Sequence, residues 1–449
     1  MPTKAATLSH PVPARTALPG LALCVLLSSF GASSANVALP ALQRAFGAGF
    51  AAVQWIVLAY LLAATAAAVG AGRLGDMIGR RRVLLGGIAL FAAASGLCAL
   101  APTLPLLAAG RALQGLGAAV MLALGMALAA GGLQRGGTGS AMGLLGSMSA
   151  VGTALGPALG GLLLAGPGWR AVFAATLPAA LAAFVLVRRV PDDAPVPTAR
   201  PPFDAVGLLL LVATLLAFAL AATGASGRGW LSGAAVAGAV LFVRIEARVA
   251  APLVPLVLLR DRVLAGGFAT SALAMALMMT TMLVGPFYLG RALGLTPGQA
   301  GLALACGPLV AALAGVPAGR LVDRRGARTA AASGLAAMAS GSGVLALVPV
   351  RMGVAGWIAP LAVLTAGYAL FQAANNTAVM EAVGSTRRGV AAGLLNLARH
   401  VGLIAGSALL GAAFAAHPRG TAAEVAAATH ATFALATLLP LLALGAARR

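Results

Sequence analysis

The stretch GRLGDMIGRRRVLL, residues 72–85, places five charged residues between two long apolar segments. Its pattern returns as GRLVDRRGAR at residues 319–328, so that both copies read G-R-L-x-D-x-x-G-x-R. Residues 139–161 and 389–411 repeat in the same way, with five glycines in register at an offset of 250 residues. A chain that repeats two motifs at this spacing is expected to contain two similar halves, as transporters with parallel internal repeats do.

The composition indicates that these halves fold in a membrane. Hydrophobic residues make up 61% of the chain and charged residues 9%, whereas about 25% of a soluble domain is charged. The apolar runs have about 18 to 25 residues, the length that a helix needs to cross roughly 30 Å of hydrocarbon. A membrane β-barrel would instead need segments of about ten residues with alternating polarity. We therefore predict an all-α polytopic membrane protein.

Hydropathy windows of about 19 residues predict fourteen transmembrane helices. They cover residues 18–40, 52–72, 83–101, 104–127, 139–165, 170–188, 205–223, 229–244, 264–288, 298–318, 329–348, 356–380, 389–414 and 427–446. Two six-helix halves related by a pseudo-twofold repeat, plus two inserted helices, account for this number. The expected parts are a cytoplasmic N-terminal tail (1–17), an N-terminal half (18–190), a linker with the inserted pair (191–262), a C-terminal half (263–446) and a cytoplasmic C-terminus (447–449).

The basic residues are distributed as the topology of a membrane protein requires. The formal net charge is +21, and an inside N-terminus puts 22 of the 30 Lys and Arg residues on the cytoplasmic side and six on the other. Because short cytoplasmic loops retain Lys and Arg, we expect both termini in the cytoplasm and a multi-pass chain in the cytoplasmic (inner) membrane. The charge lies in small clusters and not on one domain, so no nucleic-acid partner is expected.

The repeated charged motif predicts a gate. An acid at a cytoplasmic helix end, beside arginines and facing the N-terminus of a neighbouring helix, can form charge-assisted hydrogen bonds that hold the two halves together in one state. The alternative is a basic loop that fixes the topology, with one neutralising Asp. The gating residues that we predict are Gly72, Arg73, Asp76, Gly79 and Arg80 in the first copy, with Arg320 and Asp323 in the second.

Two arginines fall inside predicted helices. Arg111 lies about six residues into the fourth helix, roughly 9 Å deep, with Gln114 one turn further along. Arg399 lies near the middle of the thirteenth helix. A buried charge costs a few kcal/mol and needs a partner or a cavity, which predicts roles in proton coupling or substrate binding. The alternatives are an Arg111 side chain that reaches the interface and an Arg399 that only ties carbonyl groups.

Other residues are expected to line the cavity or to pack helices. Polar groups in the twelfth helix avoid lipid, and methionines at helical spacing suit varied apolar ligands, although both patterns also occur in helix packing. The expected lining consists of Ser33, Asn36, Met278, Met282, Tyr368, Gln372, Asn375 and Asn376. Glycines every four residues, with a proline between them, predict close helix contact and a bend in the fifth helix, at Gly152, Gly156, Pro157 and Gly160.

Several of these segments together resemble a known family. GRLGDMIGRRR, RALQGLGAA from Arg111, GTALGPALGG from Gly152, NVALP from Asn36 and WIVLAYLL from Trp55 are similar to motifs of the major facilitator superfamily, in its branch of fourteen-helix drug:proton antiporters. The resemblance covers nearly the whole chain and implies export of drugs or antibiotics by alternating access. One position departs from the branch, because Gly31 stands where an Asp is common.

The sequence favours a secondary transporter over an enzyme. It has no P-loop pattern, the Cys and His residues show no metal-ligand spacing, and the four His are scattered, so we expect no cofactor and the proton gradient as energy source. No carboxylate lies deep in a predicted helix, which favours neutral or anionic substrates over cations. We expect a monomer in the lipid bilayer that exports small amphiphilic molecules; the alternatives are a metabolite importer, an uncoupled facilitator or a sensor that does not transport.

Overall fold

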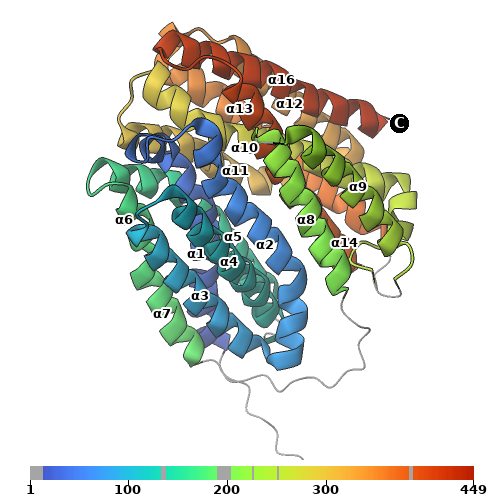
Figure 1. Cartoon of the computed structure of the whole chain (residues 1–449). Coiled ribbons are helices and arrows are strands. Elements are labelled where there is room, and N and C mark those ends of the chain that lie inside the picture. The colour runs from blue at the N-terminus through green and yellow to red at the C-terminus, as the bar shows by residue number, and fades with distance from the viewer. Residues whose placement is uncertain are drawn as a thin grey trace, which may run out of the picture.

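The computed structural model describes residues 14–132, 138–189, 204–224, 227–249, 252–383 and 388–448. Over these residues every regular element is helical (Figure 1). The elements are α1 (Ala14–Ala45), α2 (Phe50–Ile78), α3 (Arg80–Leu100), α4 (Leu104–Gly132), α5 (Thr138–Ala165), α6 (Trp169–Ala174), α7 (Thr176–Arg188), α8 (Ala205–Ala222), α9 (Arg228–Glu246), η1 (Leu256–Arg260), α10 (Arg262–Phe287), η2 (Tyr288–Ala292), α11 (Pro297–Arg325), α12 (Ala327–Leu347), η3 (Val350–Met352), α13 (Gly353–Ala382), α14 (Arg388–Ala405), η5 (Gly406–Leu410), α15 (Gly411–Ala415) and α16 (Ala422–Arg448).

Fourteen helical segments of the described chain are long and apolar enough to cross a membrane, as the sequence predicts. The expected sixth span is continuous as α6 and α7, and the thirteenth runs through α14, η5 and α15. Residues 1–13, the stretch 190–203 and Arg449 fall outside the described residues, and with them most of the expected N-terminal tail, the start of the expected linker and the last residue of the expected C-terminus.

The charged motif departs from the loop that we expected between the second and third spans. Helix α2 continues through Arg73 and Asp76 to Ile78, and α3 begins at Arg80. Hydropathy falls at the charged residues although the helix does not end there. The chain reverses at Gly79 alone, whose φ of 109° is accessible to glycine. Gly326, with a φ of 80°, makes the same turn between α11 and α12.

Helix packing follows the sequence repeat. In what we call the N-terminal half, α1 to α7, helix α5 packs on α1. In the C-terminal half, α10 to α16, helix α14 packs on α10. A Cβ atom on Gly156 would lie 2.9 Å from Ser33 Cβ, and one on the repeat-related Gly406 would lie 2.6 Å from Ala276 Cα. Glycine at these matched positions allows the same close helix contact in both halves.

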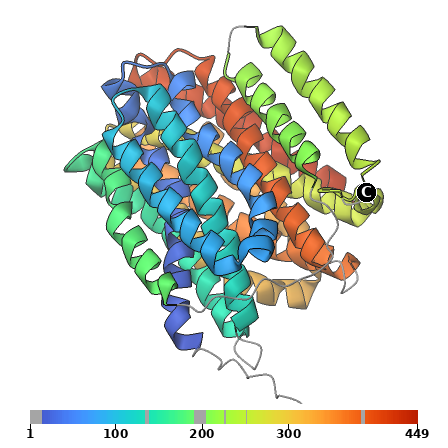
Figure 2. The same ribbon diagram turned by 60° about the horizontal axis from the view of Figure 1, so that its bottom comes forward.

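The inserted helices α8 and α9 pack on each other at the edge of the bundle (Figures 1 and 2). Helix α8 also contacts α2 of one half and α14 of the other. We refer to the side of the molecule with the turns at Gly79 and Gly326 as the basic side. The side with the turns at Gly47 and Gly294 is the opposite side.

Candidate functional site

Arg111 is the centre of a buried polar network in the N-terminal half. Its side chain is 1% exposed. It donates to the carbonyl oxygens of Ile56 on α2 and Gly31 on α1, both at 3.0 Å, and to the amide oxygen of Gln114. The guanidinium lies 4.1 Å from the ring centre of Tyr60. Arg111 therefore joins α1, α2 and α4 through one charge.

Gln114 and Tyr60 extend this network. Gln114 Nε2 donates to Ser95 Oγ on α3 at 2.8 Å, and Tyr60 donates to the carbonyl of Ser28 on α1 at 3.0 Å. The partners of Arg111 in the described structure are carbonyls, an amide and an aromatic ring, with no carboxylate among them. Its charge is stabilised by dipoles and hydrogen bonds, not by an ion pair.

A second polar cluster joins α13 to α14. Arg399 Nη2 donates to Asn376 Oδ1 at 2.5 Å, and Tyr368 interacts with Gln372 and with the charge of Arg399. Asn375 points elsewhere, because its amide donates at 3.0 Å to Gly267 O and to Ser271 Oγ on α10. Four of the five polar residues expected in this region thus share one cluster, whereas Asn375 ties α13 to α10.

Three phenylalanines close the opposite side between the halves. Phe50 belongs to α2, and its ring centre lies 5.1 Å from those of both Phe287 and Phe414 in the C-terminal half. All three rings are at most 2% exposed. Arg291 and Arg419 lie over this cluster. We call these three rings the aromatic seal.

Polar and backbone contacts surround the aromatic seal. Arg291 Nη2 donates to Gln43 Oε1 at 3.0 Å across the halves, and Gln54 donates to the carbonyl of Ser407. Burial and the nearby charge of Arg291 lower the pKa of Arg419 from its ordinary value. Helices α5 and α11 make a separate contact on the opposite side, where a Cβ on Gly161 would lie 2.5 Å from Pro297 O. In this state the two halves touch closely on the opposite side.

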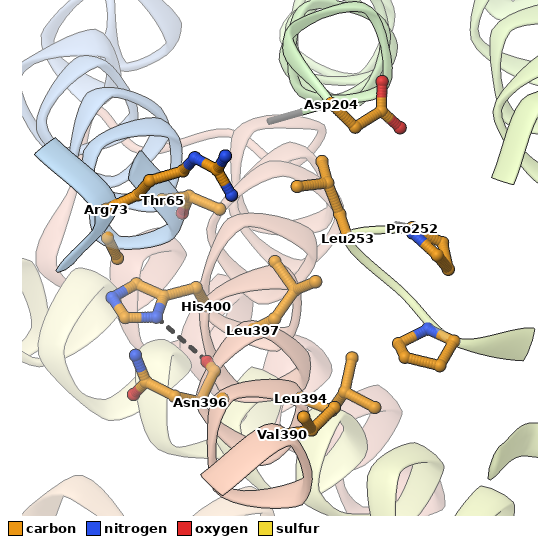
Figure 3. Close-up of a pocket in the computed structure, with 13 residues that line it drawn as sticks. Thr65, Arg73, Asp204, Pro252, Leu253, Val390, Leu394, Asn396, Leu397 and His400 are labelled. Carbon is orange, nitrogen blue, oxygen red and sulfur yellow. Dashed lines mark hydrogen bonds between the residues drawn. The ribbon is translucent and has the colours of Figure 1, made fainter. Parts of the chain in front are cut away.

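A cavity of about 450 Å³ lies on the basic side between the halves and the inserted pair (Figure 3). Helix α2 contributes Thr65 and Arg73, α14 contributes Asn396 and His400, and Asp204 stands at the start of α8. Apolar side chains of α14 and of residues 252–255 complete the lining. His400 Nδ1 lies 2.9 Å from Asn396 O, one turn earlier on its own helix. A smaller cavity is lined by Asn376, Thr377, Met380 and Glu381.

Neither cavity is lined by most of the residues that we expected there. Ser33 and Asn36 are buried in α1 and donate to carbonyls of their own helix. Met278 and Met282 are partly buried and pack against the hydrophobic core. Of the expected lining only Asn376 borders one of these two spaces. For the others, a role in the cavity stays a prediction.

The glycine face of α5 is directed at α1. A Cβ on Gly160 would lie 3.2 Å from Ser34 O, and Gly152 approaches the backbone of Leu26 in the same way. Pro157 lies inside α5, and its carbonyl oxygen approaches Gly301 of α11.

The two copies of the charged motif differ in their surroundings. Asp76 Oδ1 accepts from Arg80 Nε at 3.2 Å and from Nη2 at 3.0 Å. In the second copy Arg320 and Asp323 are exposed. The gating role of this motif stays a prediction.

Comparison with known proteins identifies the family. The model of the Major Facilitator Superfamily matches residues 21–407 and 266–447. Multidrug resistance protein Stp of Mycobacterium tuberculosis is 33% identical over 398 residues, which cover 85% of this chain and 72% of Stp. Multidrug efflux pump LfrA of Mycolicibacterium smegmatis is 32% identical over 424 residues, or 92% of this chain and 83% of LfrA. Riboflavin transporter RibZ of Clostridioides difficile is 27% identical, covering 87% of this chain and 86% of RibZ.

Solved structures show the same fold at low sequence identity. A bacterial homologue of the lysosomal transporter Spinster, in an inward-facing and unoccupied conformation, gives a TM-score of 0.69 at 16% identity and covers 97% of both chains. Nucleoside transporter NupG gives 0.72 at 12% identity, with 96% of this chain and 99% of NupG covered.

Proposed function

The chain belongs to the major facilitator superfamily of membrane transporters, which are not enzymes, and we propose that it exports small amphiphilic, drug-like compounds in exchange for protons. The observation that supports alternating access is the asymmetry between the two sides. The halves meet at the aromatic seal on the opposite side, while a cavity lies between them on the basic side. In the proposal the basic side is cytoplasmic, both termini lie there, and this state loads substrate from the cytoplasm.

The electrostatics favour neutral or anionic substrates. Arg111 and Arg399 are held by carbonyl, amide and aromatic groups, and the described helix interiors place no carboxylate beside either of them. A lipophilic cation would meet positive charge without a compensating acid. The direction of transport is supported by the similarity to Stp, a multidrug resistance protein, and to LfrA, a multidrug efflux pump. The chain acts in the inner membrane as a monomer, without a cofactor.

The proposal is tested in everted membrane vesicles that hold an imposed pH gradient. Neutral, anionic and cationic drugs are added separately, and proton release and accumulation of labelled compound are recorded. We expect neutral or anionic compounds to release protons, and Arg399→Gln to abolish the release. Arg351→Gln is the matched control, because Arg351 is exposed on the opposite side.

The alternative is a metabolite importer or an uncoupled facilitator of the same fold. It is suggested by the names of RibZ and NupG, a riboflavin and a nucleoside transporter. The panel therefore includes riboflavin and a nucleoside. If labelled compounds equilibrate across the membrane and no proton movement accompanies them, antiport is excluded and the facilitator takes its place.

A further inference from the structure

Two acidic side chains are buried together at the basic end of the inserted helices. Asp204 precedes α8 and is 7% exposed, and Glu246 is the last residue of α9 and is 2% exposed. One oxygen of each carboxyl group is satisfied by the backbone. Asp204 Oδ1 accepts from Gly207 N at 2.7 Å, and Glu246 Oε2 accepts from Val254 N at 3.0 Å.

The second oxygen of each carboxyl group accepts no hydrogen bond from a described residue. Asp204 Oδ2 and Glu246 Oε1 are buried and find no hydrogen-bond donor among the described residues. The two carboxyl groups are nevertheless within hydrogen-bonding reach of each other. They converge over Gly207, where a Cβ atom would lie 2.8 Å from both Asp204 Cγ and Glu246 Oε1. Two ionised carboxylates cannot hydrogen-bond, because both only accept.

Among the described residues, no basic side chain forms an ion pair with Asp204 or Glu246. Two titratable or charged groups face the pair across the cavity, Arg73 of α2 and His400 of α14. Three exposed arginines flank it in the sequence: Arg244 on α9, Arg248 after α9, and Arg260 of η1. Two buried like charges without a bonded cation repel each other strongly, and such pairs retain one proton.

We propose that Asp204 and Glu246 form a proton-binding site, in which one proton is held between Asp204 Oδ2 and Glu246 Oε1. The proton completes both unpartnered oxygens and joins the start of α8, the end of α9 and the segment that leads to α10. Since Asp204 also lines the 450 Å³ cavity, the proton exchanges with water there. Its loss leaves two charges that repel each other and separates the inserted helices. This site is independent of whether transport is coupled to protons.

The site is tested on the purified full chain by infrared spectroscopy between pH 5 and about 10. The chain has only nine acidic residues, so the carbonyl stretch of a protonated carboxylic acid at neutral pH is easily assigned. We expect this band in the wild type, and its disappearance in Asp204→Asn and in Glu246→Gln, because either amide can donate to the remaining carboxylate. Asp204→Asn still caps α8 through its amide oxygen. The matched control is Asp261→Asn, since Asp261 caps α10 by accepting from the backbone N–H groups of Val263 and Leu264.

Either of two spectroscopic results would overturn the proposal. One is the absence of a protonated carboxyl band from the wild-type protein at pH 7. This result does not depend on whether any variant folds. The other is a band that survives in both amide variants. The Tm gives a second readout: we expect it to fall in the wild type as the pH rises and the proton is lost, and to change little with pH in Glu246→Gln. A wild-type Tm that is constant over this range also contradicts the site.

Discussion

The aromatic seal should set the balance between the two conformations of the transporter. Phe50→Ala removes both ring pairs that α2 makes with the C-terminal half, at 5.1 Å each. An aromatic pair contributes about 0.5–1.5 kcal/mol beyond its area burial, so the closed opposite side loses about 1–3 kcal/mol. At 1.4 kcal/mol for each factor of ten, the ratio of the two conformations should change by about 5- to 150-fold toward opening on the opposite side.

The change is measured as a distance distribution between spin labels on Arg44→Cys and Ala416→Cys, both exposed on the opposite side. The three native cysteines are first replaced by serine. We expect Phe50→Ala to move population from the short to the long distance. Phe46→Ala is the matched control, because Phe46 pairs with Trp169 inside the N-terminal half, at 5.4 Å. An unchanged distribution in Phe50→Ala, or an equal shift in Phe46→Ala, would refute the assignment of the seal.

Three further substitutions test other contacts. Gly31→Asp places a carboxylate at the residue whose carbonyl accepts from Arg111. This variant should gain export of cationic dyes, measured as dye efflux, whereas Gly31→Asn should not. Arg111→Lys leaves buried acceptors unpaired at about 1–3 kcal/mol each, so we expect a clearly lower Tm, and an unchanged Tm would contradict the network. Gly161→Ala should slow transport by crowding Pro297 O at 2.5 Å, while Gly166→Ala, whose nearest neighbour would lie at 3.7 Å, should leave transport unchanged.

The spans and the repeat could be predicted from the sequence, because each depends on a local signal. A run of 18 or more apolar residues has few alternatives to a membrane helix. The glycines at 156 and 406 occupy matched sites because both must admit a neighbouring helix. The predicted end of the second helix was wrong because hydropathy falls at the charged residues Arg73 and Asp76, whereas the helix continues through them to Ile78 and is capped by Gly79.

The contacts between distant residues could not be predicted in this way. Phe50 and Phe414 are ordinary members of apolar runs, and nothing in their spacing of hundreds of residues relates them. Asp204 and Glu246 are visible as acids at predicted helix ends, but only the packing of α8 on α9 brings them together. A rule that pairs the ends of consecutive inserted helices would have brought Asp204 and Glu246 together. No comparable rule would have brought Phe50 and Phe414 together.

The described contacts divide into two classes with different consequences for the transport cycle. Arg111 binds only groups of the N-terminal half and therefore makes α1, α2 and α4 one rigid unit. Phe50 and Gln43 bind groups of the other half, and these contacts must break whenever the opposite side opens. It follows that substitutions of the first class should lower stability without changing the ratio of conformations. Substitutions of the second class should change that ratio at nearly constant stability, because the interactions they remove exist in only one of the two states.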